Sequence, residues 1–122
     1  MDNMSDLEAK LIQMKTECGV NYYLTGMAGG VRYQPVVRYN EMHCYIHRED
    51  IQAAVEYLKL KPVNSGANAV LMIPYHECVL DHSGIKNDFQ VVSPVQIYLD
   101  CMALKGRGEE LAYAVSSRDI CK

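Results

Sequence analysis

Tryptophan is absent from this 122-residue chain, Phe89 is the only phenylalanine, and nine tyrosines supply almost all the aromatic bulk. No apolar run approaches the roughly 20 residues that a membrane-spanning helix needs. The first residues have neither the charged nor the apolar region of a signal peptide. The net charge of −3 argues against the chain as a whole gripping a nucleic-acid backbone. We therefore expect a globular cytoplasmic protein.

Cysteines are present in an odd number and are widely spaced, with no Cys-x-x-Cys pair. This pattern indicates neither a disulfide framework nor a common zinc motif. We expect reduced thiols, several of them packed as small hydrophobic side chains. The five residues are Cys18, Cys44, Cys78, Cys101 and Cys121.

The segment 91–115 carries the clearest local signals. Ser93 precedes Pro94, and Gln96 follows three residues after Ser93, which is the pattern of a helix capping box. In such a box the Ser93 hydroxyl accepts the backbone N–H of Gln96, and the Gln96 side chain reaches back to the Ser93 N–H. Pro94 suits the first helical position, where its missing N–H costs nothing. The sequence therefore predicts a helix that begins at Pro94.

A second helix is predicted directly after the first, because Gly106 ends one and Gly108 begins the next with acids at its positive end. Arg107 lies between the two glycines, and we expect it to be exposed. It could contact a protein or nucleic-acid partner, or it could simply be a solvated charge. Three further cations lie nearby in the sequence: Lys105, Arg118 and Lys122.

The remaining segments alternate between helix and strand patterns. Helices are predicted over about 6–18 (with Ser5 to Glu8 as a capping box), 27–33 and 48–59; strands over 20–24, 42–47, 68–73 and 90–92; weaker strands over 36–39 and 76–80; and a polar hairpin-like loop over 81–88. The apolar run 68–73 is expected to be a central strand. This order predicts one α/β (α+β) domain over 1–122, with a mixed sheet of about four to six strands flanked by helices and two consecutive helices at its end.

One group of side chains has a metal-like composition, namely His76, Cys78, Asp81 and His82. Zinc needs three or four such ligands that converge in a tetrahedron. The spacing matches no zinc-finger or zincin pattern, so we interpret these residues as scattered loop and strand-end positions.

Cys44 lies near two histidines, which raises the question of a cysteine nucleophile. Neighbouring side chains on a strand point to opposite faces, so His43 is a poor general base for Cys44. We expect Cys44 to be a buried structural residue.

A turn at Thr25-Gly26 joins a predicted strand to a helix whose small residues, Ala28 to Gly30, would permit close backbone approach. Nucleotidyltransferase-like sites begin with a comparable unit and continue with a strand that carries paired metal-binding acids. At the corresponding strand this chain has Cys44-Tyr45-Ile46, and its turn lacks the Gly-Lys-Ser/Thr of a P-loop. We therefore assign no catalytic residue, metal or cofactor, and a catalytically empty version of that layout stays open.

Four segments together resemble the C-terminal domain of the AbiEi family of antitoxins, from bacterial type IV toxin–antitoxin and abortive-infection systems. They are LTGMAGG, NAVLMIPYHECV, VVSPVQIYLD and LKGRGEELA, and the resemblance runs from about Tyr22 to Val115. It implies a structural motif at Thr25, Gly26, Ser93, Pro94, Gly106, Gly108 and Glu109. It also implies candidate partner contacts at Gln96, Tyr98, Asp100 and Arg107.

The resemblance implies a non-enzymatic regulatory domain that antagonises a nucleotidyltransferase-type toxin. Family members join this domain to an N-terminal winged helix that binds DNA, but here the first predicted helix leads directly into the Thr-Gly unit, so we expect no winged helix within these residues. Two alternatives stay open. One is a minimal nucleotidyltransferase-like or metal-dependent enzyme, and the other is a structural module that forms a homodimer.

Overall fold

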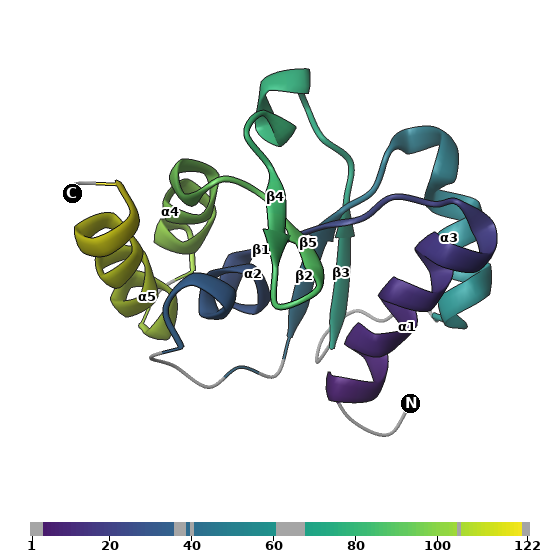
Figure 1. The fold of residues 1–122 in the computed structure, drawn as a ribbon, viewed down its shortest axis with the longest axis horizontal. Coiled ribbons are helices and arrows are strands. Elements are labelled where there is room, and N and C mark those ends of the chain that lie inside the picture. The colour runs from purple at the N-terminus through teal and green to yellow at the C-terminus, as the bar shows by residue number, and fades with distance from the viewer. Residues whose placement is uncertain (1–3, 36–38, 40, 61–67, 105, 121–122) are drawn as a thin grey trace.

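The computed structural model describes residues 4–35, 39, 41–60, 68–104 and 106–120, without the side chains of residues 4, 5 and 107 (Figure 1). Its main elements are α1 (Met4–Cys18), β1 (Tyr23–Thr25), α2 (Gly26–Tyr33), β2 (Met42–Tyr45), α3 (Ile51–Leu58), β3 (Ala69–Met72), β4 (Gly84–Lys86), β5 (Phe89–Val91), α4 (Pro94–Met102) and α5 (Arg107–Val115). Two 3-10 helices, η1 (Arg48–Asp50) and η2 (Glu77–Leu80), and a π-helix, η3 (Ser116–Ile120), complete the described elements.

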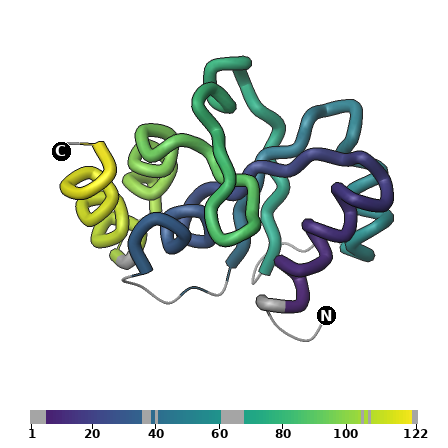
Figure 2. Tube along the Cα trace, in the orientation of Figure 1, coloured from purple at the N-terminus to yellow at the C-terminus, as the bar shows by residue number. Residues whose placement is uncertain are grey.

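The five strands form one mixed sheet in the order β3-β2-β1-β5-β4. β2 pairs parallel with β3, β1 pairs parallel with β5, and the pairs β1–β2 and β4–β5 are antiparallel. Helices α1 and α3 lie on one side of the sheet, and α2, α4 and α5 lie on the other (Figure 1). The predicted mixed sheet with flanking helices and two helices at its end is confirmed. The last helices lie at the opposite end of the molecule from α1 and α3 (Figure 2).

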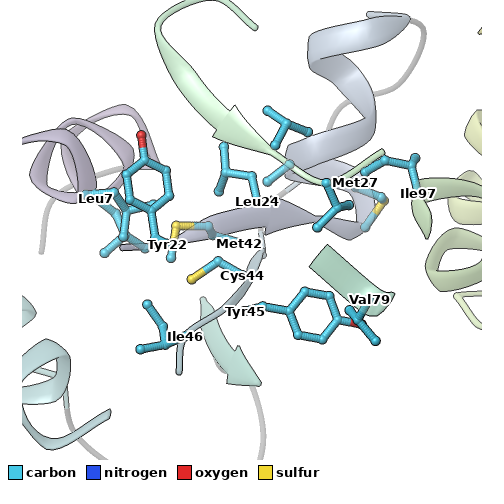
Figure 3. Packing of buried hydrophobic residues seen from close by; sticks show 14 of the residues in the cluster. Leu7, Tyr22, Leu24, Met27, Met42, Cys44, Tyr45, Ile46, Val79 and Ile97 are labelled. Atoms are coloured by element: carbon cyan, nitrogen blue, oxygen red, sulfur yellow. The ribbon is translucent and has the colours of Figure 1, made fainter. Parts of the chain in front are cut away.

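Alternation along β2 divides its side chains between the two faces of the sheet. Met42, Cys44 and Ile46 are fully buried, and with Leu24 of β1 they belong to one hydrophobic core (Figure 3). His43 and Tyr45 point to the opposite face, because successive strand residues alternate. β2 therefore serves both the core and the face where α4 packs.

The small residues of α2 bring that helix close to its neighbours, as predicted. A Cβ atom on Gly29 would lie 2.8 Å from the Leu24 carbonyl oxygen and from Ile97 Cδ1. On Gly30 it would lie 2.5 Å from Leu111 Cδ2. Contacts this short do not occur between real side chains. The two glycines therefore allow α2 to pack against β1, α4 and α5 at once.

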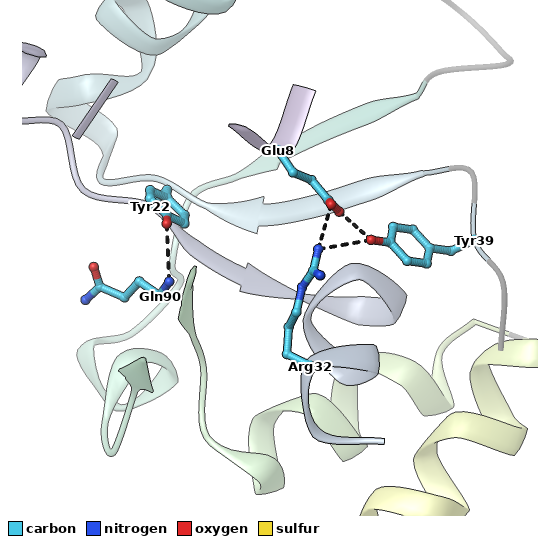
Figure 4. Close-up of polar contacts among 5 residues, drawn as sticks. All are labelled: Glu8, Tyr22, Arg32, Tyr39 and Gln90. Atoms are coloured by element: carbon cyan, nitrogen blue, oxygen red, sulfur yellow. Dashed lines mark hydrogen bonds and ion pairs between the residues drawn. The ribbon is translucent and has the colours of Figure 1, made fainter. Parts of the chain in front are cut away.

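The predicted capping box at Ser5 is wrong, because α1 begins at Met4 and Ser5 already lies within the helix. Glu8, which the box would have used, is instead buried and forms an ion pair with Arg32, with 2.6 Å between Glu8 Oε1 and Arg32 Nη2. The Tyr39 hydroxyl donates to Glu8 Oε2 and accepts from Arg32 Nη2 (Figure 4). This group joins α1 to α2, since a buried charge must be paired.

A second buried tyrosine supports the edge of the sheet on which the β4–β5 hairpin lies. The backbone N–H of Gln90 donates to the Tyr22 hydroxyl at 3.3 Å (Figure 4). Burial raises the pKa of Tyr22, so the hydroxyl stays protonated at neutral pH.

The predicted strand over 76–80 is wrong, because residues 77–80 form the 3-10 helix η2. His76 caps this turn: its Nδ1 accepts the backbone N–H of Cys78 at 3.1 Å. The polar loop over 81–88 contains β4, which forms a hairpin with β5. Asn87 and Asp88, the two turn residues, both have positive φ, which suits a two-residue hairpin.

The apolar run 68–73 forms β3 at an edge of the sheet, so its predicted central position is wrong. Its residues 69–72 are only half-buried, which fits a strand with an unpaired edge. The predicted strand over 36–39 falls almost entirely on residues outside the described ranges. For the run 68–73, hydrophobicity indicates that side chains are buried, but it does not indicate which strands lie on either side. It therefore could not distinguish an edge strand from a central one.

Half of the predicted capping box at the start of α4 is confirmed. Ser93 Oγ accepts the backbone N–H of Gln96 at 3.2 Å. The Gln96 side chain does not return to Ser93, because its Nε2 donates to Asp100 Oδ1 at 3.0 Å.

The prediction that Gly106 ends the first helix and Gly108 begins the second is wrong, because α4 ends at Met102 and α5 begins at Arg107. Gly106 instead precedes α5, and its N–H donates to the Glu109 carboxylate at 3.3 Å.

Ser93→Ala is expected to lower the free energy of unfolding by about 1 kcal/mol, because it removes the acceptor for the Gln96 N–H. Urea denaturation measures the change. Thr16→Ala is the matched control, since it removes an exposed hydroxyl that bonds only to the Ile12 carbonyl within α1. An equal loss in both variants would mean that the cap contributes nothing of its own.

Candidate functional site

Helix α4 packs over the Thr25-Gly26 turn and is hydrogen-bonded to it. Thr25 is fully buried at the end of β1, and its hydroxyl does not cap α2. The hydroxyl instead donates to Asp100 Oδ2 at 2.5 Å. The next residue, Gly26, has φ of +61°, a conformation that favours glycine. A Cβ atom there would lie 3.2 Å from His43 Nδ1, so this glycine also makes room for the His43 ring.

The Asp100 carboxylate accepts hydrogen bonds from side chains of three elements. Besides Thr25 of β1, the Tyr45 hydroxyl of β2 donates to Oδ2 at 2.9 Å, and Gln96 of α4 donates to Oδ1 at 3.0 Å. Hydrogen bonds to an ionised carboxylate are about twice as strong as those between neutral groups. The Asp100 carboxylate therefore fixes α4 against two neighbouring strands.

Burial and the nearby Asp100 carboxylate raise the pKa values of two neighbouring side chains. Burial first, and then the charge of Asp100 and its hydrogen bond, raise the pKa of Tyr45 above its ordinary value. The same two effects, burial and then Asp100, raise the pKa of the Cys101 thiol to about 12. Both groups are therefore protonated at neutral pH, and Tyr45 acts as a hydrogen-bond donor.

A cavity of about 290 Å³ opens beside the Thr-Gly turn. The floor of the cavity is one face of the sheet. It carries Thr25 of β1, His43 of β2 and Val70 of β3, which are paired neighbours across the three strands. The C-terminal end of α4 supplies one wall. The lining residues are Thr25, Gly26, His43, Val70, Met72, Asp100, Ala103 and Leu104.

His43 is the unusual residue of this cavity, since it is only 9% exposed and its Nδ1 has no hydrogen-bond partner. Its Nε2 lies 3.7 Å from Glu41 Oε1. Burial lowers the pKa of His43, although the charges of Glu41 and Asp100 act in the opposite direction. The imidazole is therefore neutral at pH 7, with one ring nitrogen free to accept a hydrogen bond.

The structure places Cys44 in the core and His76 in a helix-capping contact. Cys44 is fully buried on the face opposite to His43, and burial raises its pKa to about 12, which confirms the structural interpretation. His76 Nδ1 is engaged with the Cys78 N–H. Within the described ranges, no three His, Cys, Asp or Glu side chains are grouped so that they could hold a metal ion.

The four candidate partner contacts have different surroundings. Gln96 is buried and holds Asp100, Tyr98 is half-buried, and Asp100 faces the cavity. Arg107 begins α5, and its side chain lies outside the described part of the chain. Contact between these residues and a partner stays a prediction.

Sequence reasoning missed His43 and Tyr45 as site residues. The signal for them was the alternation in MHCYIH, which places residues 43, 45 and 47 on one face and the apolar residues 42, 44 and 46 on the other. That pattern separates the faces, but it does not show that Thr25 and Asp100 lie over the polar one.

A family model for transcriptional regulators described as AbiEi antitoxins of type IV toxin–antitoxin systems matches residues 2–121. The chain belongs to the AbiEi antitoxin family. Comparisons with curated proteins and with solved structures find no match. This AbiEi-family chain thus has an antitoxin or transcriptional-regulator role in a type IV system. In the described ranges none of its helices has both the length and the apolar character needed to cross a membrane.

Thr25→Val is expected to lower the free energy of unfolding by about 2 kcal/mol, because it replaces a buried donor to a carboxylate with a methyl group of similar size. Thr25→Ser, which keeps the hydroxyl, is the matched control and is expected to lose clearly less. Urea denaturation of both variants tests this, and equal stability of the Val and Ser variants would contradict the assigned hydrogen bond.

Proposed function

We propose that this domain is a non-enzymatic recognition domain, which antagonises the toxin of its type IV system through protein contacts made by α4. The observation that carries the proposal is the bonding of Asp100, whose carboxylate is occupied by Thr25, Tyr45 and Gln96. It is the only acid that lines the cavity at the Thr-Gly turn among the described residues. Phosphoryl transfer with two metal ions needs paired acids.

An exposed apolar stripe on α4 supports protein contact. Val95 and Leu99 are 53% and 54% exposed and lie one helical turn apart, so they project from the same side of the helix. Ala103, another turn further on, is also exposed. We call Val95 and Leu99 the α4 outer face. Adjacent exposed apolar side chains are typical of surfaces that bind proteins.

The α4 outer face is next to the residues that the family resemblance selects. Tyr98 and Asp100 flank Leu99 in the sequence, and Arg107 follows at the glycine corner. We assign contact with the toxin to Tyr98 and Arg107, and we assign to Gln96 the role of positioning Asp100, whose carboxylate holds α4 in place. We assign no DNA contact to this surface, since the chain carries a net charge of −3 and the stripe is apolar.

The double variant Val95→Lys and Leu99→Lys is expected to abolish toxin neutralisation in a growth assay with the toxin gene co-expressed, because two charges on the contact surface would have to be desolvated. Its melting temperature should stay close to the wild-type value, since both side chains are exposed. Ile85→Lys, at a similarly exposed apolar residue of β4, is the matched control.

Three results would contradict the proposal. Neutralisation by the double variant at the wild-type level would remove α4 from the contact. Dissociation of a wild-type dimer into monomers by the same variant, without loss of neutralisation, would favour a dimerisation module. Incorporation of a labelled nucleotide in the presence of Mg²⁺ or Mn²⁺, lost in Asp100→Asn, would establish an enzyme.

Arg107→Ala is expected to weaken neutralisation while it leaves the melting temperature almost unchanged, because Arg107 follows the Gly106 corner and is assigned to the partner. The same growth assay and a thermal melt measure the two effects. Arg48→Ala, which removes an exposed cation in η1, is the matched control. Unfolding of the Arg107 variant would show that the side chain has a structural role instead.

A further inference from the structure

We propose that the cavity between Thr25, His43 and Asp100 binds a small organic cation, namely a guanidinium or ammonium group at the end of a short aliphatic stem. Such a group is found on free alkylamines and alkylguanidines, and also at the ends of lysine and arginine side chains. This binding activity goes beyond the proposed function and does not depend on the α4 outer face.

The charge of the cavity favours a cation. Asp100 lines it, and Glu41 Oε1 lies 3.7 Å from Nε2 of His43, another lining residue. No lysine or arginine is among the lining residues, and none forms an ion pair with Asp100 in the described part of the chain. Phosphates and carboxylates would be repelled there, because nothing described in the lining offsets the Asp100 charge.

The unpartnered nitrogen of His43 supplies a second acceptor. The buried Nδ1 lies beside Gly26 with no hydrogen-bond partner among the described residues, and it is an acceptor when the neutral imidazole carries its proton on Nε2. Buried polar atoms without a partner are rare in folded proteins, so this atom needs a donor that the described residues do not provide. An N–H group of a bound cation would satisfy it.

The rest of the cavity suits an aliphatic stem. Val70 and Met72 of β3, with Ala103 and Leu104 at the end of α4, form apolar walls. The volume of about 290 Å³ is at the lower limit of pockets that bind drug-sized ligands, so the ligand must be smaller than that class. The Asp100 carboxylate is already oriented by three donors, so its position is set before a ligand binds.

Calorimetry on the folded full chain tests the inference with four probes that share a butyl stem: n-butylguanidinium, n-butylammonium, neutral 1-butanol and anionic butyrate. We expect one or both cations to bind, and the alcohol and the anion to bind at least about tenfold more weakly, since they lack the charge that Asp100 attracts. In NMR spectra the cation should shift the imidazole resonances of His43. Equal binding of all four probes, or failure of both cations to bind, would overturn the inference.

Two variants test separately the contributions of the Asp100 charge and of the cavity volume. Asp100→Asn is expected to weaken cation binding about tenfold by removing the charge, and Val70→Phe is expected to abolish it by filling the cavity while Asp100 stays in place. Glu110→Gln removes an exposed carboxylate on α5 and is the matched control. Because Asp100→Asn also alters the bonds to α4, a thermal melt accompanies each variant. Undiminished binding by a folded Val70→Phe variant would place the cation elsewhere.

The affinity for the cation should fall on acidification from about pH 8 to about pH 5, because protonation of His43 removes the acceptor and adds a positive charge. Glu41, Tyr45 and Asp100 are the other titratable groups near this ring. His43→Gln keeps a polar side chain and should flatten the pH profile. A profile that is unchanged in His43→Gln would contradict the role of Nδ1.

A final comparison distinguishes the two sources of the cation. The blocked tripeptide Gly-Arg-Gly presents the same guanidinium on a peptide backbone. Binding as strong as that of n-butylguanidinium supports insertion of a partner's arginine side chain. Exclusion of the peptide while the free cation binds supports a small-molecule ligand. Retention of toxin neutralisation by the Val95→Lys and Leu99→Lys double variant, with cation binding intact, would contradict only the recognition role of α4, so the two proposals can fail separately.

Discussion

The position of α4 depends on how the Asp100 carboxylate is satisfied. A carboxylate that is partly removed from water is costly unless donors replace the lost solvent, and here Thr25, Tyr45 and Gln96 do so. Two of these donors come from neighbouring strands, so the bonds fix both the height and the rotation of α4 over the sheet. One side of the helix then lines the cavity, while Val95 and Leu99 face outward.

The glycines of α2 make this arrangement sterically accessible. With side chains at 29 and 30, α2 would be pushed away from β1, and α4 and α5 would have to move with it. The Thr25 hydroxyl could then no longer reach Asp100. The close packing of α2 and the hydrogen bonding of α4 therefore depend on each other. The glycines of α2 let the helices approach the sheet closely, and this approach brings the Asp100 carboxylate within reach of its donors.

Local signals predicted those parts of the fold that local energetics decide. The Ser93 cap was read correctly, because it depends on residues within one turn of the helix. Gly106 was read as the end of α4, but α4 ends at Met102, and Gly106 instead precedes the first residue of α5. The edge position of β3 and the convergence of Thr25, His43 and Asp100 were not predictable, since they depend on pairing between distant segments. At η2 the His76 cap prevailed over the strand formers that follow it.

The chemistry at the Thr-Gly turn follows from where the chain places its acid. An acid on β2 would point from a rigid strand into the cavity, but β2 there carries His43 and Tyr45 on that face and the buried Cys44 on the other. The acid comes instead from α4, where its oxygens are already bonded to side chains of the protein. The orientation of a carboxylate held in this way is fixed before any ligand arrives. The turn, the strand and the helix thus form the preorganised frame from which we propose recognition of a partner, in a chain whose family is described as antitoxins.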